Sequence, residues 1–210
     1  MQYELNCPSQ RLPEDVKELL RFARGFQLSK YEEFNFTGMG QLGLEDIFPY
    51  SVELAGDGAG NFWIVDVKSN GDWGPVYYAE HEMPVIVKQA DSLQEMLEQL
   101  YNDCRNRNQE SFYYIVDENI YRVNELPGRG LIDMEVARQS GDALLLAISE
   151  QYGDNFAIAD LRNKPNGTGF NWGQYGKGER NYEAIRYKEE PVWLFEKKKN
   201  KGFLSRLFGG

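Results

Sequence analysis

The sequence predicts an α+β protein in which helices pack against a sheet. Two segments, residues 13–25 and 91–103, have the apolar spacing of amphipathic helices. Between them, short runs of β-branched and aromatic residues alternate with glycine-containing turns, as is typical of consecutive strands. Aromatic side chains make up 14% of the 210 residues, which favours a packed, β-containing protein over a disordered one.

The first helix is expected to begin at Pro13 and to end near Gly25. Proline is favoured in the first turn of a helix, and Glu14 and Asp15 suit its positive end. One face of the helix is apolar, with Val16, Leu19, Leu20 and Ala23. Residues 26–43 are expected to form a loop with at most one short strand, and residues 44–48 a helical turn or a short strand.

Four strands are expected next, near residues 50–55, 61–67, 75–80 and 84–88. The turn GDGAGN joins the first two, and Gly58 or Gly60 is expected there in a conformation that disfavours a Cβ atom. The second helix begins at Asp91 or Ser92, because Ser92 and Glu95 have the spacing of a capping box. Its apolar face consists of Leu93, Met96, Leu97 and Leu100.

The polar segment 102–109 is predicted to separate an N-terminal domain, residues 1–108, from a β-rich extension or second domain, residues 109–196. Two hairpins are expected there, one over residues 111–123 and one from residues 143–149 and 155–161. Between them, residues 134–139 are expected to form a short helix. A long loop over residues 164–179 and two strands, 182–187 and 191–196, complete this part. Residues 197–210 are predicted to form a separate basic, amphipathic tail.

The charge is concentrated in the N-terminal half. The whole chain has a formal net charge of −10, and residues 31–103 alone contain 14 acidic residues against two lysines. Such a field repels nucleic acid and attracts basic partners, although it is also a common means of keeping a protein in solution. No segment is apolar over the length of a membrane span, and the N-terminus lacks the features of a signal peptide. Together with the two cysteines, which show no metal-site spacing, these features predict a cytoplasmic location.

No catalytic residue, metal site or cofactor is predicted. His81 is the single histidine, and its neighbours Glu80 and Glu82 would point to the opposite face of a strand. The glycine turn GDGAGN leads into a strand, whereas a phosphate-binding loop leads into the N-terminus of a helix. It also lacks the ligand spacing of a calcium loop. A tight turn is therefore the expected role of this motif.

Three features in order resemble the SUKH superfamily, which includes the Smi/Knr cell-wall regulators and many bacterial immunity proteins. They are the helix opened by Leu12-Pro13, the segment GDGAGNFWIVDV, and a Gly/Trp loop followed by VYYAEHE and the capped helix DSLQEMLEQL. The resemblance covers residues 11–103 and implies a curved, mainly antiparallel sheet with packed helices. It also implies an immunity protein that binds and occludes a cognate toxin with a basic surface. A regulatory scaffold of the Smi/Knr type and an enzyme with its site in the C-terminal half are the alternatives.

The expected partner-binding residues are acidic or large and aromatic. Acidic residues would meet a basic toxin, and tryptophans in glycine-rich loops are good contact anchors, unless they fold back onto the core. These residues are Asp57, Asp72, Trp73, Glu80, Glu82 and Trp172. In the tail, one helical face would carry Phe203, Leu204, Leu207 and Phe208. This tail could bind a partner groove, pack onto the acidic half of its own chain or, less favourably, contact an anionic membrane.

Overall fold

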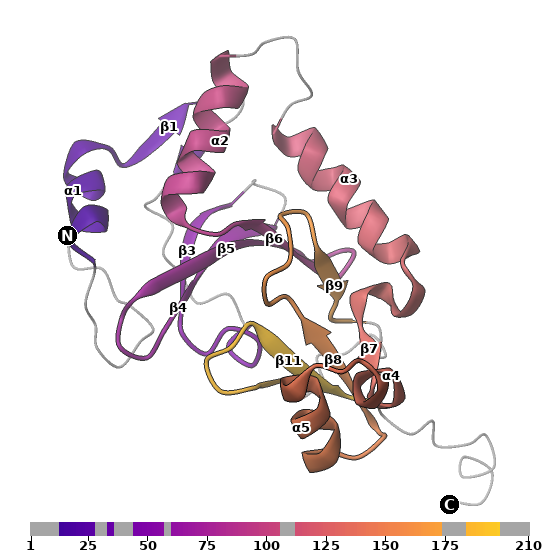
Figure 1. Cartoon of the computed structure of the whole chain (residues 1–210). Helices are drawn as coiled ribbons and strands as arrows, with labels where there is room; N and C mark the ends of the chain where they lie inside the picture. Colours follow the sequence, from indigo (N-terminus) through magenta and orange to yellow (C-terminus); the bar gives the residue numbers. More distant parts are fainter. Residues whose placement is uncertain are drawn as a thin grey trace, which may run out of the picture.

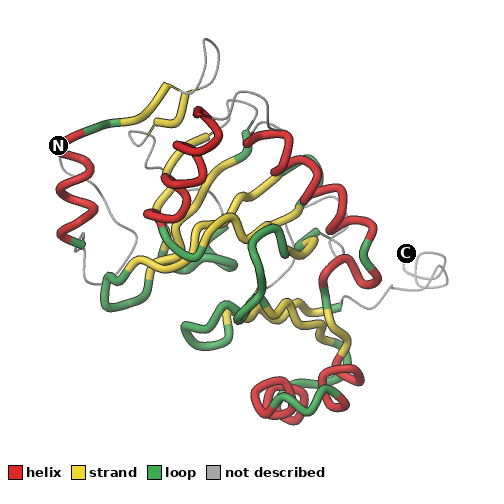
Figure 2. Tube along the Cα trace, turned by 45° about the horizontal axis from the view of Figure 1, so that its top comes forward, coloured by secondary structure: helices red, strands yellow, loops and turns green. Residues whose placement is uncertain are grey.

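The computed structural model describes residues 13–27, 33–35, 44–56, 60–105, 112–173 and 184–197. Its helices and strands form four layers (Figures 1 and 2). The helices are α1 (Glu14–Phe22), α2 (Leu93–Arg105), α3 (Phe112–Glu125), α4 (Met134–Gln139) and α5 (Ala143–Gln151), with a 3₁₀ turn η1 (Pro127–Gly130). The strands are β1 (Gly25–Gln27), β2 (Glu33–Asn35), β3 (Ser51–Gly56), β4 (Phe62–Val67), β5 (Trp73–Glu80), β6 (Val85–Ala90), β7 (Ile132–Asp133), β8 (Phe156–Asp160), β9 (Gly169–Asn171), β10 (Ala184–Arg186) and β11 (Val192–Glu196).

Two antiparallel sheets make up the middle layers. The larger sheet has the order β3-β4-β5-β6-β9 and the smaller has the order β10-β11-β8-β7, while β1 and β2 form a separate ribbon. The sheets pack face to face because side chains alternate along each strand. Ile64 of β4, Tyr77 of β5 and Trp193 of β11 point into the shared core. The Trp193 indole donates a hydrogen bond of 2.6 Å to the carbonyl oxygen of Ile47.

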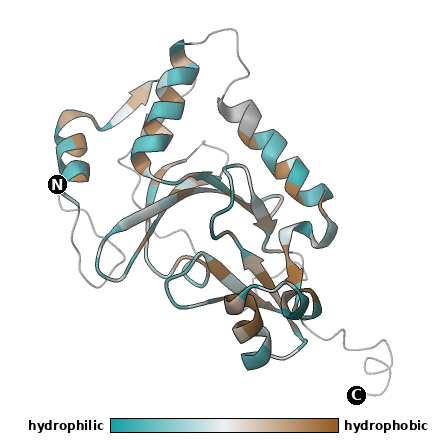
Figure 3. Cartoon of the chain, viewed as in Figure 1, coloured by the Kyte–Doolittle hydropathy of each residue, from teal (hydrophilic) through white to brown (hydrophobic). Residues whose placement is uncertain are grey.

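Helices cover the outer face of each sheet. On the larger sheet, Trp63 and Val65 point to the side opposite Ile64, where they pack with α2 and α3. On the smaller sheet, Ile158 and Leu194 pack with the buried face of α4 and α5. Figure 3 shows α1 and α2 alternating between hydrophobic and hydrophilic residues, whereas α5 is hydrophobic over much of its length. The order of layers is therefore helices, larger sheet, smaller sheet, helices.

The predicted fold class and most N-terminal elements are confirmed, but the segment 26–43, expected to hold at most one short strand, contributes to two, β1 and β2. The structure has α1 and the four strands β3 to β6 within a few residues of their expected positions. The capping box also forms, because Ser92 Oγ accepts from the Glu95 amide at 3.1 Å and Glu95 accepts from the Asp91 amide at 2.7 Å. Gly60 has a φ of +98°, as expected for one of the two turn glycines. Gly58 lies outside the described residues.

Both predicted hairpins are wrong, since α3 covers residues 112–123 of the first and α5 covers residues 143–149 of the second. In α3, Val116, Ile120 and Val123 recur at i, i+4 and i+7 and face the sheet. Its aromatic and β-branched residues favour strands, but the helical spacing of its buried residues fits the core. Residues 143–149 belong to α5, whose N-terminus is capped by Asp142. A short apolar run cannot by itself distinguish a strand from a buried helix.

The loop predicted over 164–179 contains a short strand, β9, that pairs with β6 of the larger sheet. The helix α3 lies on the same sheet, with Val116 in the core that α2 also covers. Elements on both sides of residue 108 thus share one hydrophobic core. The division of the chain into domains at residue 108 stays a prediction.

Candidate partner-binding groove

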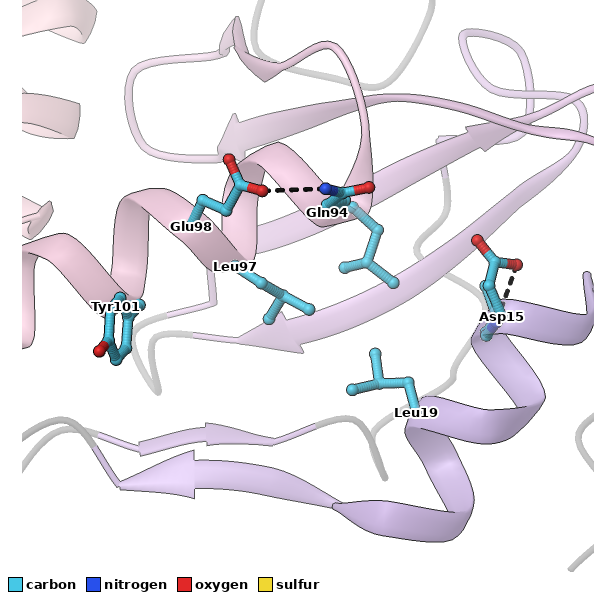
Figure 4. Close-up of a pocket in the computed structure, with 8 residues that line it drawn as sticks. Asp15, Leu19, Gln94, Leu97, Glu98 and Tyr101 are labelled. Carbon is cyan, nitrogen blue, oxygen red and sulfur yellow. Dashed lines mark hydrogen bonds between the residues drawn. The ribbon is translucent and has the colours of Figure 1, made fainter.

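A groove lies between α1 and α2 on the helical side of the larger sheet (Figure 4). Its volume is about 370 Å³, which is in the range of ligand-binding clefts. Four apolar and four polar residues line it, namely Val16, Leu19, Leu93, Leu97, Asp15, Gln94, Glu98 and Tyr101. We refer to this hollow as the α1–α2 groove.

The amphipathic pattern of the two helices creates the groove. Met96 and Leu100 of α2 are buried against the larger sheet, and Val16 is the buried residue of α1. Leu19 and Leu97 are only half-buried, and they point toward one another across the gap between the helices (Figure 4). The two helices therefore carry more apolar surface than their packing on the sheet covers.

Two carboxylates at the rim of the groove have no counter-charge in the described part of the chain. Asp15 accepts a hydrogen bond from the Val16 amide at 2.9 Å, and Glu98 accepts from the Gln94 side chain at 2.9 Å. The neighbouring Glu14, in contrast, is bound by Lys17 at 3.0 Å, which lowers the pKa of its carboxyl group. Asp15 and Glu98 are exposed and free to meet a basic partner.

The two helices that form the groove each carry an exposed aromatic ring. Phe22 lies one turn beyond Leu19 on α1 and is 86% exposed, and Tyr101 of α2 is 60% exposed. Arg105 fixes Tyr101, because its guanidinium donates to the phenol oxygen at 3.0 Å and lies 5.5 Å from the ring centroid. Large exposed aromatics next to an apolar hollow are typical of protein-contact surfaces.

The predicted site residues on β5 lie at its two opposite ends. Asp72 is exposed in the turn before β5, where it accepts from the Asn70 side chain at 2.9 Å. Trp73 is half-buried against the larger sheet's helical core, and its indole nitrogen has no hydrogen-bond partner in the described structure. This tryptophan therefore folds back onto the core, which was the alternative to a contact role.

Glu80 and Glu82 lie at the other end of β5, and Trp172 follows β9, which pairs with β6 near that end. Glu80 is buried and accepts from the Glu82 amide at 3.0 Å, whereas Glu82 itself is exposed. His81 is in the turn after β5, with Nδ1 4.0 Å from Glu80, so the expected separation of these two side chains does not hold. Trp172 packs against the core between the sheets, and its amide donates to the Pro84 carbonyl at 2.8 Å.

None of the predicted partner-binding residues that the structure describes lines the α1–α2 groove. Asp57 and the tail residues Phe203, Leu204, Leu207 and Phe208 lie outside the described part of the chain. The sequence contains one signal for the groove: Leu19 and Leu97 belong to the apolar faces of the two predicted helices, and these faces carry more apolar residues than the sheet buries. Contact between Leu19 or Leu97 and a partner stays a prediction, as does contact between a partner and the residues singled out from the sequence.

A second cluster of charged residues lies between the two sheets. Arg186 donates to both carboxylate oxygens of Asp66, at 2.6 and 3.2 Å, and its guanidinium lies 4.5 Å from the Trp193 ring centroid. Burial raises the pKa of Asp66, and Arg186 opposes this shift. Burial also raises the pKa of Tyr77. The adjoining cavity is only about 40 Å³, enough for a water molecule but not for a substrate.

In the residues that the structure describes, no group of three or more His, Cys, Asp or Glu side chains is placed to hold a metal ion. Within the same residues, no helix has the length and apolarity required to cross a membrane.

The model of the SMI1/KNR4 family (SUKH-1) matches residues 2–99, slightly less than half of the chain. The match confirms the resemblance to the SUKH superfamily and shows that the N-terminal part of the chain is an SMI1/KNR4 domain. It includes α1, β3 to β6 and the lining residues of the groove up to Glu98. Comparison with curated proteins and with solved structures found no match.

Proposed function

We propose that this protein is a cytoplasmic immunity protein that binds a cognate bacterial toxin and blocks it by occlusion. The observation that carries the proposal is the α1–α2 groove, which combines an apolar floor with two rim carboxylates that lack a described counter-charge. Its position within the SMI1/KNR4 domain supports a role in that family's mode of action. The excess of acidic residues over the same half of the chain supports a basic partner.

The proposed mechanism uses binding alone, with no chemical step. Apolar side chains of the toxin would occupy the space between Leu19 and Leu97, and its lysines or arginines would meet Asp15 and Glu98. Exposed acidic residues elsewhere on the domain, such as Asp72 and Glu82, would contribute to the long-range field. Such a field accelerates association with a basic surface and weakens as salt is added. A toxin with a basic active-site cleft, as in enzymes of anionic substrates, would be covered and inhibited.

A regulatory scaffold of the Smi/Knr type is the second candidate, and the family match supports it equally. It would use the same groove but leave the activity of the bound protein unchanged. An enzyme with its site in the C-terminal half is supported less well. The buried Asp66–Arg186 cluster, which joins the N-terminal and C-terminal halves, adjoins a cavity too small for a substrate.

Co-purification from the native cell, followed by mass spectrometry, tests the proposal. We expect the wild-type chain to retain a basic protein, and the double variant Asp15→Lys/Glu98→Lys to lose it. Glu135→Lys is the matched control, because it reverses an exposed helical carboxylate on α4, in the layer behind the smaller sheet. Equal retention of the same protein by both variants would show that the groove is not the contact site.

A further inference from the structure

The C-terminal segment of this chain has a composition that complements the α1–α2 groove. Residues 197–210 contain five basic residues and no acidic ones. Their apolar residues, Phe203, Leu204, Leu207 and Phe208, have the i, i+1, i+4, i+5 spacing that would place them on one face of a helix. The groove offers an apolar floor between two carboxylates without a described counter-charge.

The dimensions also agree. A helix formed by residues 203–210 would be about 12 Å long, at 1.5 Å per residue. The α2 side of the groove extends from Leu93 to Tyr101, which is also about 12 Å by the same rise. Two helical turns carrying four large apolar side chains would therefore fill the groove along its length. The lysines that precede Phe203 would be close to the acidic rim.

The C-terminal segment cannot reach the α1–α2 groove of its own chain. Lys197 is fixed beside the smaller sheet, where its side chain pairs with Asp133 and its amide donates to the Asn155 carbonyl. Figures 1 and 2 both place α1 and α2 on the side of the molecule away from β7 and α4. Sheet and helix layers are each about 10 Å apart, so the groove is at least about 20 Å away through the protein itself.

The connecting residues are too few for a path around the protein body. The six Cα–Cα steps from Lys197 to Phe203 span at most about 22 Å when fully extended, which is close to the direct distance through the protein, and the chain must take the longer path around it. A second copy of the chain has no such restriction.

We propose that residues 203–210 of one copy dock as a helix in the α1–α2 groove of a second copy, with residues 198–202 as the connecting segment. Each copy has one groove and one tail, so the contact is head-to-tail and either closes into a reciprocal dimer or extends into longer assemblies. A two-turn helix buries a small interface, and the association is therefore expected to be weak, with a dissociation constant on the order of micromolar or above. The docking itself needs no toxin. Only one consequence of the docking rests on the proposed function, namely that the C-terminal segment and the toxin compete for the groove.

Sedimentation equilibrium of the purified full-length chain tests the docking. We expect the average mass of the wild type to rise with concentration and to fall as salt is added, because the contact joins opposite charges. The tail variant Phe203→Asp/Leu207→Asp and the groove variant Asp15→Lys/Glu98→Lys should each weaken association by about tenfold or more. Glu135→Lys should associate like the wild type.

Mixing the two defective chains distinguishes docking from a general loss of stability. The tail variant retains an intact groove, and the groove variant retains an intact tail, so their equimolar mixture should form one-to-one dimers that neither forms alone. A labelled synthetic peptide of residues 198–210 should bind the wild type and the tail variant but not the groove variant.

A wild type that remains monomeric at millimolar concentration and does not bind the peptide would overturn the proposal. So would association that both double variants leave unchanged, or a mixture that remains monomeric. Binding of the peptide to vesicles of anionic lipid but not to the protein would assign the tail to a membrane surface instead. All these measurements use the chain alone, so their failure leaves the binding of a toxin untouched.

Discussion

The ion pair between Asp66 and Arg186 predicts a large and pH-dependent loss of stability when it is broken. Asp66 belongs to β4 of the larger sheet and Arg186 to β10 of the smaller one, and their side chains are only 14% and 7% exposed. We consider Arg186→Met, which removes the guanidinium and keeps an apolar stem over the Trp193 ring. Asp66 then remains in the same buried position without its partner.

Removing one member of a buried ion pair typically costs about 3–5 kcal/mol. This is a large part of the total stability of a domain, which is about 5–15 kcal/mol. Arg186 also donates to the Glu190 carbonyl, so some of the loss is independent of pH. The remainder depends on the ionisation of Asp66, which separates the two contributions.

The sign of the pH dependence follows from the raised pKa of Asp66. Burial already raises this pKa in the folded protein, and loss of Arg186 removes a cause that lowers it. A carboxyl group whose pKa is raised in the folded protein does not lower the free energy of unfolding at pH values below its unfolded-state pKa of about 4. It lowers the free energy of unfolding as the pH rises through its folded-state pKa. The loss of unfolding free energy in Arg186→Met should therefore be largest near pH 7 and should become smaller toward pH 4.

Urea unfolding at pH 7 and near pH 4 measures both effects. The double variant Asp66→Asn/Arg186→Met removes the buried charge together with its partner and should recover much of the stability at pH 7. A urea midpoint for Arg186→Met equal to that of the wild type would refute the reasoning. The reasoning would also be refuted if the loss of unfolding free energy were equal at both pH values and the double variant were as unstable as the single one.

Three further predictions concern backbone conformation and helix capping. In urea unfolding, Gly60→Ala should lower the free energy of unfolding by about 1–2 kcal/mol more than Gly56→Ala does. The reason is that Gly60 has a φ of +98° and its new Cβ would lie 3.0 Å from His81. Equal unfolding midpoints for the two variants would contradict this. By the same measurement, Gly130→Ala should lower the free energy of unfolding by about 3 kcal/mol or more, since its φ is +80° and the Cβ would overlap the Gly169 carbonyl. An unfolding midpoint equal to that of the wild type would show that η1 does not cross β9 this closely. Asp142 accepts from the Leu145 and Leu144 amides, which together with Arg162 lower its pKa. The stability it contributes should be present above about pH 4 and lost as pH falls through the lowered value, and a carboxyl titration followed by NMR with a midpoint at or above 4 would exclude this role.

The parts of the fold that the sequence predicted depend on local signals. The capping box at Ser92 fixed the start of α2, and strand patterns separated by glycine turns indicated β3 to β6, which pair with their neighbours in sequence. The helical period in α3 was also local, but the strand propensity of its residues concealed it. Propensity is a weak guide where tertiary packing decides the conformation.

The parts that were missed depend on contacts between distant residues. The strand β9 has three residues and is stabilised as a strand by β6, some 80 positions earlier in the chain. The packing of the two sheets through Trp193 and Ile64 likewise has no local signature. The α1–α2 groove arises because two helices far apart in sequence lie side by side, so neither helical pattern alone predicted it.

The most direct measurement of the central claim is the activity of the co-purified partner as the chain is added. If the protein is an immunity protein, the wild type and Glu135→Lys should abolish that activity at about one chain per partner. Asp15→Lys/Glu98→Lys should need at least about tenfold more protein, because two attractive contacts become repulsive. A partner that binds the wild type and remains fully active would contradict the proposed function and favour the scaffold. Equal inhibition by all three chains would contradict the role of the α1–α2 groove.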